Sequence, residues 1–399
     1  MKYGIRTLDD VDVAGKTVLC RVDINQPVDK ASGTLRSTAR IRACVPTVRE
    51  LADRGARLVL LAHQGSDIEY QNYYSLAPHA KVLEALLGRE VRFLPDVCGP
   101  AAQAAIRSLE PGQILLLDNV RFLAEEQTLF ELNLRLTHPQ QAQTLLVRTL
   151  APLADLYICD AFAAAHRDQP SLCGFEQVLP SAMGRLFERE YCVVSDLMAA
   201  PSHPCTFILG GAKVSDAFLM LRAVLENGAA DRVLTGGLVA NIMLAAAGKE
   251  IGSGSMDFIE ASGYAGFIGT ARELYSQYQS RIVLPVDAIP AGAALTDVGS
   301  HTAVLYQDLI RGSATVFANG PMGAFEQPET ELGTRAVWNA LGDTKAFTVI
   351  GGGDSITAAA KYGVTDKLDY VCTGGGALIR FLSGEELPVV RALRHGSTL

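Results

Sequence analysis

The sequence predicts an α/β protein of two domains, each with its own parallel β-sheet flanked by helices. Three observations lead to this prediction. The chain has 399 residues, which is longer than a single hydrophobic core usually spans. Short apolar runs alternate with segments of helical periodicity along its length. Polar residues follow the apolar runs of the first half, whereas glycines follow most of those in the second half.

Nine apolar runs predict the strands. Continuous apolar runs are typical of strands that are covered on both faces, as in parallel sheets with helical crossovers. The first-half runs are TVLCRV (17–22), RLVLLA (57–62), QILLLD (113–118) and LYICDA (156–161). The second-half runs are TFILGG (206–211), RVLTGG (232–237), TVFANG (315–320), FTVIGG (347–352) and YVCTGG (370–375).

Helices are expected between these runs, for example over 37–55 and 215–228, and both segments end on glycine as helices often do. The domain boundary is expected within 180–204, where a segment of helical character is followed by the breaker APSHP. We place the domains at 1–185 and 186–385, followed by a C-terminal tail at 386–399.

The composition argues against several classes of protein. A net charge of -8 is unfavourable for binding nucleic acid, whose phosphates need a basic face. No apolar run approaches the ~20 residues that a membrane helix requires, and the start MKYGIRTLDD does not resemble a signal peptide. The eight cysteines are scattered without a CxxC pair, which indicates reduced thiols. We therefore expect a cytoplasmic protein.

The polar residues of the first half predict an anion site. In open parallel sheets, ligands bind at the carboxyl ends of the strands. Three arginines follow successive strands, and their guanidinium groups would suit a phosphate and a carboxylate. Nearby polar side chains could bond a substrate hydroxyl or the same anion. The arginines are Arg40, Arg121 and Arg167, and the other side chains are Asp23, Asn25, His63 and His166. Each arginine alone would be an ordinary surface residue, and their joint placement carries the prediction.

The glycines of the second half predict a second, backbone-lined crevice. GGAK (210–213) and GGGDS (351–355) each follow a strand and precede a helix, where backbone N–H groups can approach phosphates. Lys213 adds a positive charge, and Asp354 would either cap a helix or hold Mg²⁺. Glu326 could accept from a ribose hydroxyl or be a surface acid. Neither a GxxxxGK[ST] loop nor a strand-linked GxGxxG occurs, so the dehydrogenase interpretation lacks its fingerprint.

Taken in chain order, these segments resemble the phosphoglycerate kinase family. The matching segments run over nearly the whole chain, which makes the resemblance specific. They are RVDINQP (21–27), LLLDNVRF (115–122), DAFAAAHR (160–167), LGGAKVSD (209–216), TGGLVAN (235–241), NGPMGAFE (319–326), IGGGDS (350–355) and CTGGGA (372–377). The segment LAHQG (61–65) is similar to the archaeal branch of the family.

The resemblance implies two Rossmann-like domains joined by a hinge, with 3-phosphoglycerate on the first and Mg²⁺-ATP or -ADP on the second. It also implies a C-terminal tail that packs toward the first domain, and domain closure during turnover. The implied substrate-binding residues are Asp23, Asn25, Arg40, His63, Gln64, Gly65, Ser66, Arg121 and Arg167. The implied nucleotide-binding residues are Gly211, Lys213, Glu326, Gly352, Gly353, Asp354 and Ser355, with Asp297 and Gly299 beside the nucleotide.

The expected reaction is reversible phosphoryl transfer between ATP and the carboxylate of 3-phosphoglycerate. Arg40 and Lys213 are the expected catalytic residues, and Asp354 is the expected metal ligand. Two departures leave alternatives open. Ser66 stands where the family usually has a basic residue, and Ala217 where many members have a second lysine. A same-fold kinase for another small carboxylic acid and a catalytically silent binding protein therefore remain as alternatives. The chain is expected to be a monomer or a homodimer.

Overall fold

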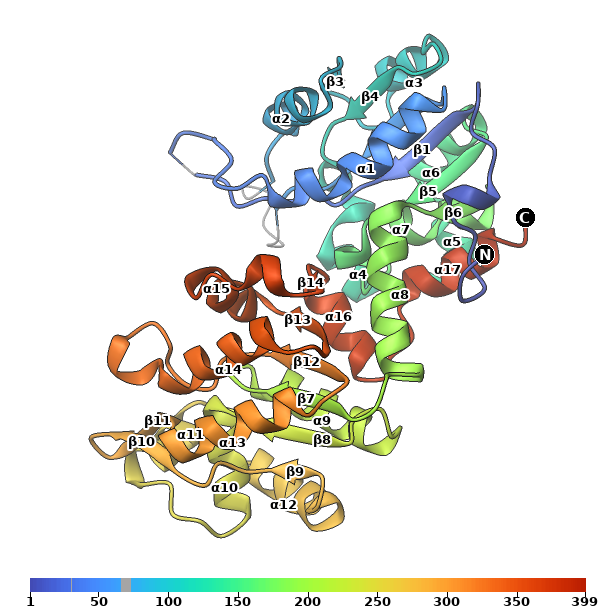
Figure 1. Ribbon diagram of the computed structural model, residues 1–399. Coiled ribbons are helices and arrows are strands. Elements are labelled where there is room, and N and C mark those ends of the chain that lie inside the picture. Colours follow the sequence, from blue (N-terminus) through green and yellow to red (C-terminus); the bar gives the residue numbers. More distant parts are fainter. Residues whose placement is uncertain (30, 66–72) are drawn as a thin grey trace. The chain divides into compact units, whose positions relative to one another are not determined.

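The computed structural model describes residues 1–29, 31–65 and 73–399. The chain forms two compact units (Figure 1). Unit 1 comprises Met1–Cys192 and Glu386–Leu399, and unit 2 comprises Val193–Glu385. Each unit contains a six-stranded sheet in which all neighbouring strands are parallel. The predicted α/β class with two parallel sheets is confirmed.

The sheet of unit 1 has the strand order β3-β4-β2-β1-β5-β6. Its strands are β1 (Thr17–Arg21), β2 (Arg57–Leu61), β3 (Arg92–Leu94), β4 (Ile114–Leu117), β5 (Leu156–Cys159) and β6 (Ser181–Met183). The four apolar runs predicted as strands are β1, β2, β4 and β5. The edge strands β3 and β6 were not predicted. The helical expectation for the segment after 180 was wrong at its start, because β6 pairs with β5 before the helix begins at Arg185.

Helices cover this sheet. They are α1 (Ala39–Asp53), α2 (Ala77–Leu87), α3 (Pro100–Arg107), α4 (Thr128–Leu134), α5 (His138–Gln141), α6 (Leu145–Leu150), α7 (Pro170–Cys173), α8 (Arg185–Ala199) and α17 (Pro388–Gly396). The boundary between the units lies within α8. The last helix, α17, packs on α7 and β6, and the backbone N–H of Arg6 donates to Ser397 Oγ at 3.0 Å.

The sheet of unit 2 has the strand order β14-β13-β12-β7-β8-β9. Its strands are β7 (Cys205–Leu209), β8 (Arg232–Thr235), β9 (Ile282–Val283), β12 (Thr315–Asn319), β13 (Phe347–Gly351) and β14 (Tyr370–Cys372). All five runs predicted in this half are strands. The short edge strand β9 was not predicted, and neither was the antiparallel pair β10 (Ala288–Ala291) and β11 (Ala294–Val298).

The helices of unit 2 follow its strands in a βα alternation. They are α9 (Val214–Glu226), α10 (Gly237–Ala246), α11 (Ser253–Ala261), α12 (Phe267–Tyr278), α13 (Ser300–Arg311), α14 (Leu332–Asp343), α15 (Gly353–Lys361) and α16 (Gly375–Leu382). The two helices predicted as examples are α1 and α9. The chain leaves each of them through a glycine with positive φ, at +79° for Gly55 and +80° for Gly228, as the left-handed end of a helix favours.

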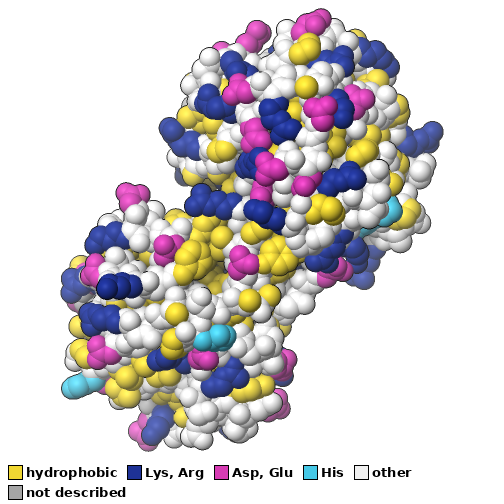
Figure 2. Space-filling view, turned by 45° about the vertical axis from the view of Figure 1, so that its right-hand side comes forward, with side chains coloured by type: hydrophobic (Ala, Val, Ile, Leu, Met, Phe, Trp, Pro, Cys, Tyr) yellow, Lys and Arg dark blue, Asp and Glu magenta, His cyan; other side chains and the backbone are white. Residues whose placement is uncertain are grey.

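The central strands are apolar because both faces of each sheet are covered. Every residue of β1, β4, β7 and β12 is buried. Each unit has its own hydrophobic core, with Leu60 in the core of unit 1 and Trp338 in that of unit 2. On the face shown in Figure 2, acidic and basic side chains are interspersed. None of the helices among the described residues has the length and apolar character needed to cross a membrane.

Replacing Leu60 by alanine should destabilise the protein, because Leu60 is fully buried in β2 directly before the predicted anion site. We expect a loss of about 2–5 kcal/mol in the free energy of unfolding. Leu145→Ala is the matched control, since this leucine is 61% exposed and the same change there should cost no more than about 0.5 kcal/mol. Urea denaturation followed by circular dichroism measures both, and equal losses would contradict the burial argument.

Candidate functional site

The first candidate site lies at the carboxyl edge of the unit 1 sheet. Because β4, β2, β1 and β5 are neighbours and parallel, the loops that follow them meet at one edge. These loops carry the site residues predicted in the first half, apart from Arg40 in the first turn of α1. Ser66 lies outside the described residues.

Side-chain amides tie the loops after β1 and β2 together. Asn25 Nδ2 donates to the Gly65 carbonyl at 3.3 Å, and the Gly65 N–H donates back to Asn25 Oδ1 at 3.1 Å. Gln64 and Gln26 form a second reciprocal pair: the Gln26 N–H donates to Gln64 Oε1 at 3.0 Å, and Gln64 Nε2 donates to the Gln26 carbonyl at 2.8 Å. Asn25, Gln64 and Gly65 were predicted as substrate contacts, and in this structure their amide groups fix the shape of the crevice.

Asn119, which follows β4, extends this amide network. Its Oδ1 accepts from the backbone N–H groups of Gln64 and Arg121, both at 3.1 Å. Its Nδ2 donates to the Gln64 carbonyl at 2.9 Å. Asn119 is fully buried, so these bonds are shielded from water. The predicted site residues did not include it, although its place directly after an apolar strand was visible in the sequence.

Arg40 is paired with Asp23 across the crevice loops. Arg40 Nη1 donates to Asp23 Oδ2 at 2.7 Å. The Arg40 side chain is 39% exposed and Asp23 only 4%. Asp23 Oδ1 also accepts from the Asn25 N–H at 3.1 Å. The buried carboxylate therefore orients an arginine whose remaining side-chain N–H groups have no partner in the part of the chain that the structure describes.

Arg121 is buried with unsatisfied hydrogen-bond donors. Its side chain is 1% exposed, and its Nη1 donates to the Gly65 carbonyl. Among the described residues, Arg121 Nε and Nη2 have no hydrogen-bond partner. Burial, and then the charge of Arg167, lower the pKa of Arg121 to about 10. A buried cation with open donors is costly unless an anion pairs with it.

Arg167 is held from the other side of the crevice by residues of α4. Its Nη1 donates to Thr128 Oγ1 at 3.2 Å and lies 3.8 Å from Glu131 Oε2. Glu131 Oε1 accepts from the Asp168 N–H at 2.8 Å, and Glu131 Oε2 accepts from Gln169 Nε2 at 3.1 Å. Glu131 therefore fixes both the arginine and the backbone that carries it. The sequence analysis did not single out Glu131.

The lowered pKa of His63 indicates that several arginines lie near this one side chain. Burial lowers the pKa of His63 well below its usual value, and the charges of Arg21, Arg121, Arg167 and Arg40 lower it further. The imidazole is therefore neutral at physiological pH. Four arginines acting on one buried ring indicate a region of strong positive potential, which is the environment that a small anion requires.

The second candidate site lies at the carboxyl edge of the unit 2 sheet, where the chain turns from strands into helices. A small hollow there is lined by Gly210, Gly211, Ala212, Lys213, Asn319, Gly320, Gly352, Gly353, Asp354, Ser355 and Ile379. Positive φ angles of +75° at Gly211 and +90° at Gly352 are accessible to glycine at little cost. A Cβ on Gly237 would lie 2.7 Å from the Gly211 nitrogen, so larger residues would separate these turns.

The charged residues of this hollow occupy the starts of two helices. Lys213 precedes α9 and is exposed. Asp354 lies in the first turn of α15 and is also exposed, but the N-cap of that helix is Gly352 and no side chain caps it. The capping interpretation of Asp354 is therefore wrong. Ser355 is buried, and its Oγ accepts from the Gly320 N–H at 2.8 Å, so it joins the first turn of α15 to the loop that follows β12.

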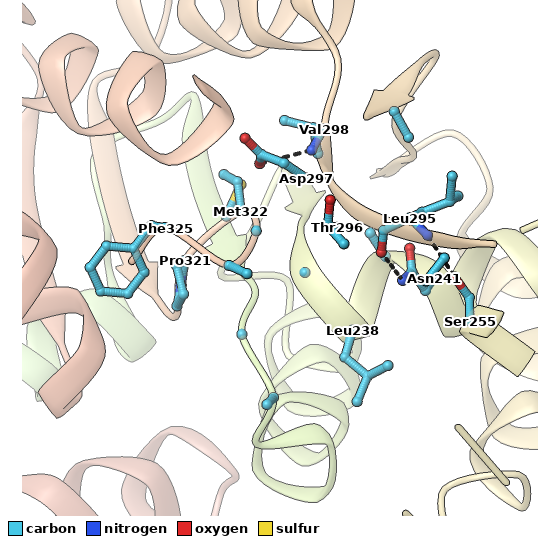
Figure 3. A pocket seen from close by; sticks show the side chains of 18 of the residues that line it. Leu238, Asn241, Ser255, Leu295, Thr296, Asp297, Val298, Pro321, Met322 and Phe325 are labelled. Atoms are coloured by element: carbon cyan, nitrogen blue, oxygen red, sulfur yellow. Dashed lines mark hydrogen bonds between the residues drawn. The ribbon is translucent and has the colours of Figure 1, made fainter. Parts of the chain in front are cut away.

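A larger apolar cavity of about 460 Å³ adjoins the hollow (Figure 3). The two share Gly211, Ala212 and Asp354, so they form one continuous site. Leu238, Met322 and Phe325 lie around the cavity. Its polar groups are mostly engaged within the protein: Asn241 Nδ2 donates to the Leu295 carbonyl at 3.1 Å, and the Leu295 N–H donates to Ser255 Oγ at 2.8 Å.

Of the residues predicted to bind the nucleotide, some line the hollow and others line the cavity. Glu326 and Asp297 line the cavity. Gly299 does not line it and instead forms the N-cap of α13, where a Cβ would collide with the Asp287 carboxylate. The lining also includes residues from β11, which the sequence analysis missed because its apolar and polar residues do not form a continuous run.

Asp297 is a buried carboxyl group in the cavity wall. Its Oδ1 accepts from the Val298 N–H at 2.8 Å and its Oδ2 from the Gly333 N–H at 2.7 Å. Burial nevertheless raises the pKa of Asp297 to about 6 from 3.8. The folded state therefore favours the protonated form, and this stabilisation is lost as the pH rises through about 6.

We expect the stability of the wild type to fall relative to Asp297→Asn as the pH is raised from about 4.5 to 7.5. At roughly 1.4 kcal/mol per pH unit, the roughly 1.5 units between pH 4.5 and the folded-state pKa of about 6 should change the difference between the two proteins by about 2 kcal/mol. Urea denaturation at a series of pH values measures it. The exposed Asp257→Asn is the control and should follow the wild type. A constant difference between wild type and Asp297→Asn would contradict the raised pKa.

Known proteins resemble this chain over nearly its whole length. The sequence matches the family profile described as "Phosphoglycerate kinase" over residues 8–385. It is 45% identical to the phosphoglycerate kinase of Methanothermobacter thermautotrophicus, over 99% of this chain and 98% of that protein. It is 41% identical to that of Methanothermus fervidus, over 98% of each chain. The crystal structure of phosphoglycerate kinase from Pyrococcus horikoshii OT3 superimposes with a TM-score of 0.87 at 36% identity, covering 99% of this chain and 100% of that one.

These matches confirm the resemblance predicted from the sequence, including its archaeal character. A family profile that covers almost the whole chain, full-length relatives and a full-length structural match all lead to the same assignment. This chain belongs to the phosphoglycerate kinase family.

Proposed function

We propose that this protein transfers a phosphoryl group reversibly between ATP and the carboxylate of 3-phosphoglycerate, giving ADP and 1,3-bisphosphoglycerate. Membership of the phosphoglycerate kinase family, in which this is the glycolytic reaction, supports the proposal. The observation that carries it in this chain is the state of Arg121. A guanidinium group buried with two unpartnered nitrogens among the described residues calls for an anionic ligand.

In unit 1, we assign 3-phosphoglycerate to the arginine-lined crevice. The substrate carries a phosphate and a carboxylate, and arginine is well suited to both because its planar guanidinium group can donate two parallel hydrogen bonds. Arg121 and Arg167 would bind the anionic groups. Neutral His63 would donate a further hydrogen bond. Asp23 would accept from the substrate hydroxyl while it orients Arg40.

In unit 2, we assign the nucleotide base and ribose to the cavity, and the phosphates to the glycine-lined hollow. Apolar walls suit a base, and Glu326 offers an acceptor for a ribose hydroxyl. Backbone N–H groups at the starts of α9 and α15 favour phosphates. Asp354 lines both the cavity and the hollow, and its carboxylate is exposed. A carboxylate oxygen is a ligand that Mg²⁺ prefers. When bound, Mg²⁺ would neutralise charge on the nucleotide phosphates.

The reaction needs no general base in this chain, because the attacking carboxylate is already ionised near neutral pH. The difficulty lies in bringing two anions together and in stabilising the charge on the phosphoryl group during transfer. We assign Arg40 and Lys213 to that charge. The pairing of Arg40 with buried Asp23 sets its orientation before substrate binds, and this lowers the reorganisation required at the moment of transfer.

A coupled assay of the purified protein with 3-phosphoglycerate and Mg²⁺-ATP tests the activity. We expect 1,3-bisphosphoglycerate to form only when both substrates and Mg²⁺ are present. Glycerate, which lacks the phosphate, is the matched control, and it should react far more slowly because the arginines have no phosphate to bind. Absence of product with 3-phosphoglycerate would refute the proposed function.

Replacing Arg40 by alanine should lower kcat by about 10²–10³, the usual cost of losing a group that stabilises developing charge. The dissociation constant of Mg²⁺-ATP, measured by calorimetry, should change less than about twofold, because the nucleotide is assigned to unit 2. Arg42→Ala is the control: Arg42 lies two residues along α1 and is exposed. Unchanged turnover in Arg40→Ala would remove this arginine from the proposed mechanism.

Replacing Asp354 by alanine should weaken the binding of Mg²⁺-ADP by at least about tenfold, a typical effect of disturbing a metal site. Without Mg²⁺, the same change should leave ADP binding equal or tighter, since it removes a negative charge near the phosphates. Exposed Asp366→Ala in the same unit is the control. Calorimetry with and without Mg²⁺ measures both effects. A loss of affinity that does not depend on Mg²⁺ would argue against metal binding by Asp354.

A further inference from the structure

Arg21 is the last residue of β1. It differs from the other arginines near the crevice because it is fully buried and each of its three guanidinium nitrogens has a hydrogen-bond partner in the protein. Arg21 Nε donates to Ser171 Oγ at 3.0 Å. Its Nη1 donates to the Val22 carbonyl at 2.7 Å, and its Nη2 lies 3.0 Å from His63 Nδ1. Its relative exposure is 0%. An arginine held in this way is placed to act on His63 rather than on a ligand.

The contact with Arg21 determines which nitrogen of His63 carries the proton. A guanidinium group can only donate hydrogen bonds, so His63 Nδ1 must be the acceptor. The ring is neutral because burial and four arginine charges lower the pKa of His63. Its single proton must therefore be on Nε2. Nε2 has no hydrogen-bond partner among the described residues, so its N–H is available.

Two further residues hold Arg21 in place. Ser171, in α7, donates through its N–H to Glu126 Oε1 at 2.5 Å and through its hydroxyl to Glu126 Oε2 at 2.7 Å. The hydroxyl has one proton, so its lone pairs remain to accept from Arg21 Nε. All three residues are fully buried. Burial raises the pKa of Glu126 to about 7, and the bonds from Ser171 and the charge of Arg21 oppose this rise without cancelling it.

We propose that Glu126, Ser171 and Arg21 form a positioning relay that holds His63 as the neutral Nε2–H tautomer. The crevice then presents His63 to an anion as a donor with no lone pair facing the ligand. The opposite tautomer would face the anion with a lone pair and repel it. That the anion is 3-phosphoglycerate rests on the proposed function, whereas the tautomer itself does not.

The tautomer can be measured directly in the ligand-free protein. Long-range ¹H–¹⁵N correlation spectra distinguish the two neutral tautomers and the charged imidazole, and His63→Gln identifies the His63 signals by their loss. We expect the Nε2–H form in the wild type. Ser171→Ala, which removes the bridging hydroxyl, should give a mixture of tautomers. The control Ser181→Ala also removes a buried hydroxyl of unit 1, but one bonded to the Leu179 carbonyl, and it should keep the Nε2–H form.

Kinetics provide a second measurement that a purely structural role would not change in the same way. Ser171→Ala should lower kcat/KM for 3-phosphoglycerate by between about tenfold and a hundredfold, as misplaced contacts commonly do, and leave KM for ATP unchanged. His63→Gln, whose amide can reproduce a donor at the Nε2 position, should retain more activity than His63→Asn. Equal losses in the two His63 variants would contradict a donor role at Nε2.

The outcomes separate the relay from the proposed function. An Nδ1–H or charged His63 in an active wild type would refute the relay and leave the function intact. The expected tautomers in a protein that does not phosphorylate 3-phosphoglycerate would support the relay and refute the function. If Ser171→Ala does not fold, as judged by circular dichroism, Arg21→Met takes its place, because methionine keeps much of the length of the side chain but has no hydrogen-bond donor. If the folded variant still has only the Nε2–H tautomer of His63, the relay would also be refuted.

Discussion

The amide network that joins the loops after β1, β2 and β4 is the constraint on which the first site depends. Parallel strands bring loops from distant parts of the sequence to one edge, but they do not fix the shapes of those loops. Asn25, Gln64 and Asn119 do so through paired hydrogen bonds to backbone groups that would otherwise be buried without partners. The positions of Arg121 and His63 follow from this network, because both residues lie on the loops that it holds.

The two proposed sites would attract anions by different physical means. Unit 1 offers full charges on arginine side chains, which suit strong and directional binding to a small ligand with two anionic groups. Unit 2 offers backbone N–H groups at helix starts, and these require the close approach that glycine allows at Gly211 and Gly352. A backbone-lined hollow suits a phosphate chain, whose charge is spread over several oxygens and would also be neutralised by the proposed metal ion.

The sequence was sufficient to predict the central strands and the polar and glycine residues that gather at their carboxyl ends, and the physical reason is the same. Strands buried on both faces must be continuously apolar, and ligand-binding residues must follow them. The edge strands β3, β6 and β9 have two or three residues each, too few to form a pattern by themselves, whereas the equally short edge strand β14 was recognisable by the glycine run that follows it. The pair β10 and β11 is partly exposed and pairs antiparallel, so it lacks the continuous apolar signal of the central strands.

The residues that position others were hidden for a different reason. Arg21 lies in the segment RVDINQP (21–27), from which only Asp23 and Asn25 were predicted as site residues. Its partners Ser171 and His63 are separated from it by 150 and 42 residues. Neither separation forms a local pattern, so only the fold reveals the contact. The same holds for Glu131. It accepts from the N–H of Asp168, which is 37 residues further along the chain, and it lies beside Arg167. Sequence motifs therefore predicted the groups that we assign to ligands, whereas only long-range packing revealed the groups that orient them.

Arg121 has no partner for Nε and Nη2 among the described residues, and this has an energetic consequence for ligand binding. In the ligand-free protein, burial of this guanidinium group without a full set of partners is unfavourable, and the repulsion from Arg167 adds to that cost. An anion that pairs with both arginines removes the cost and gains hydrogen bonds from groups that are already oriented. If 3-phosphoglycerate binds as proposed, stability that the ligand-free fold forgoes at this crevice is recovered as affinity for that substrate, which is the expected behaviour of a site organised before binding.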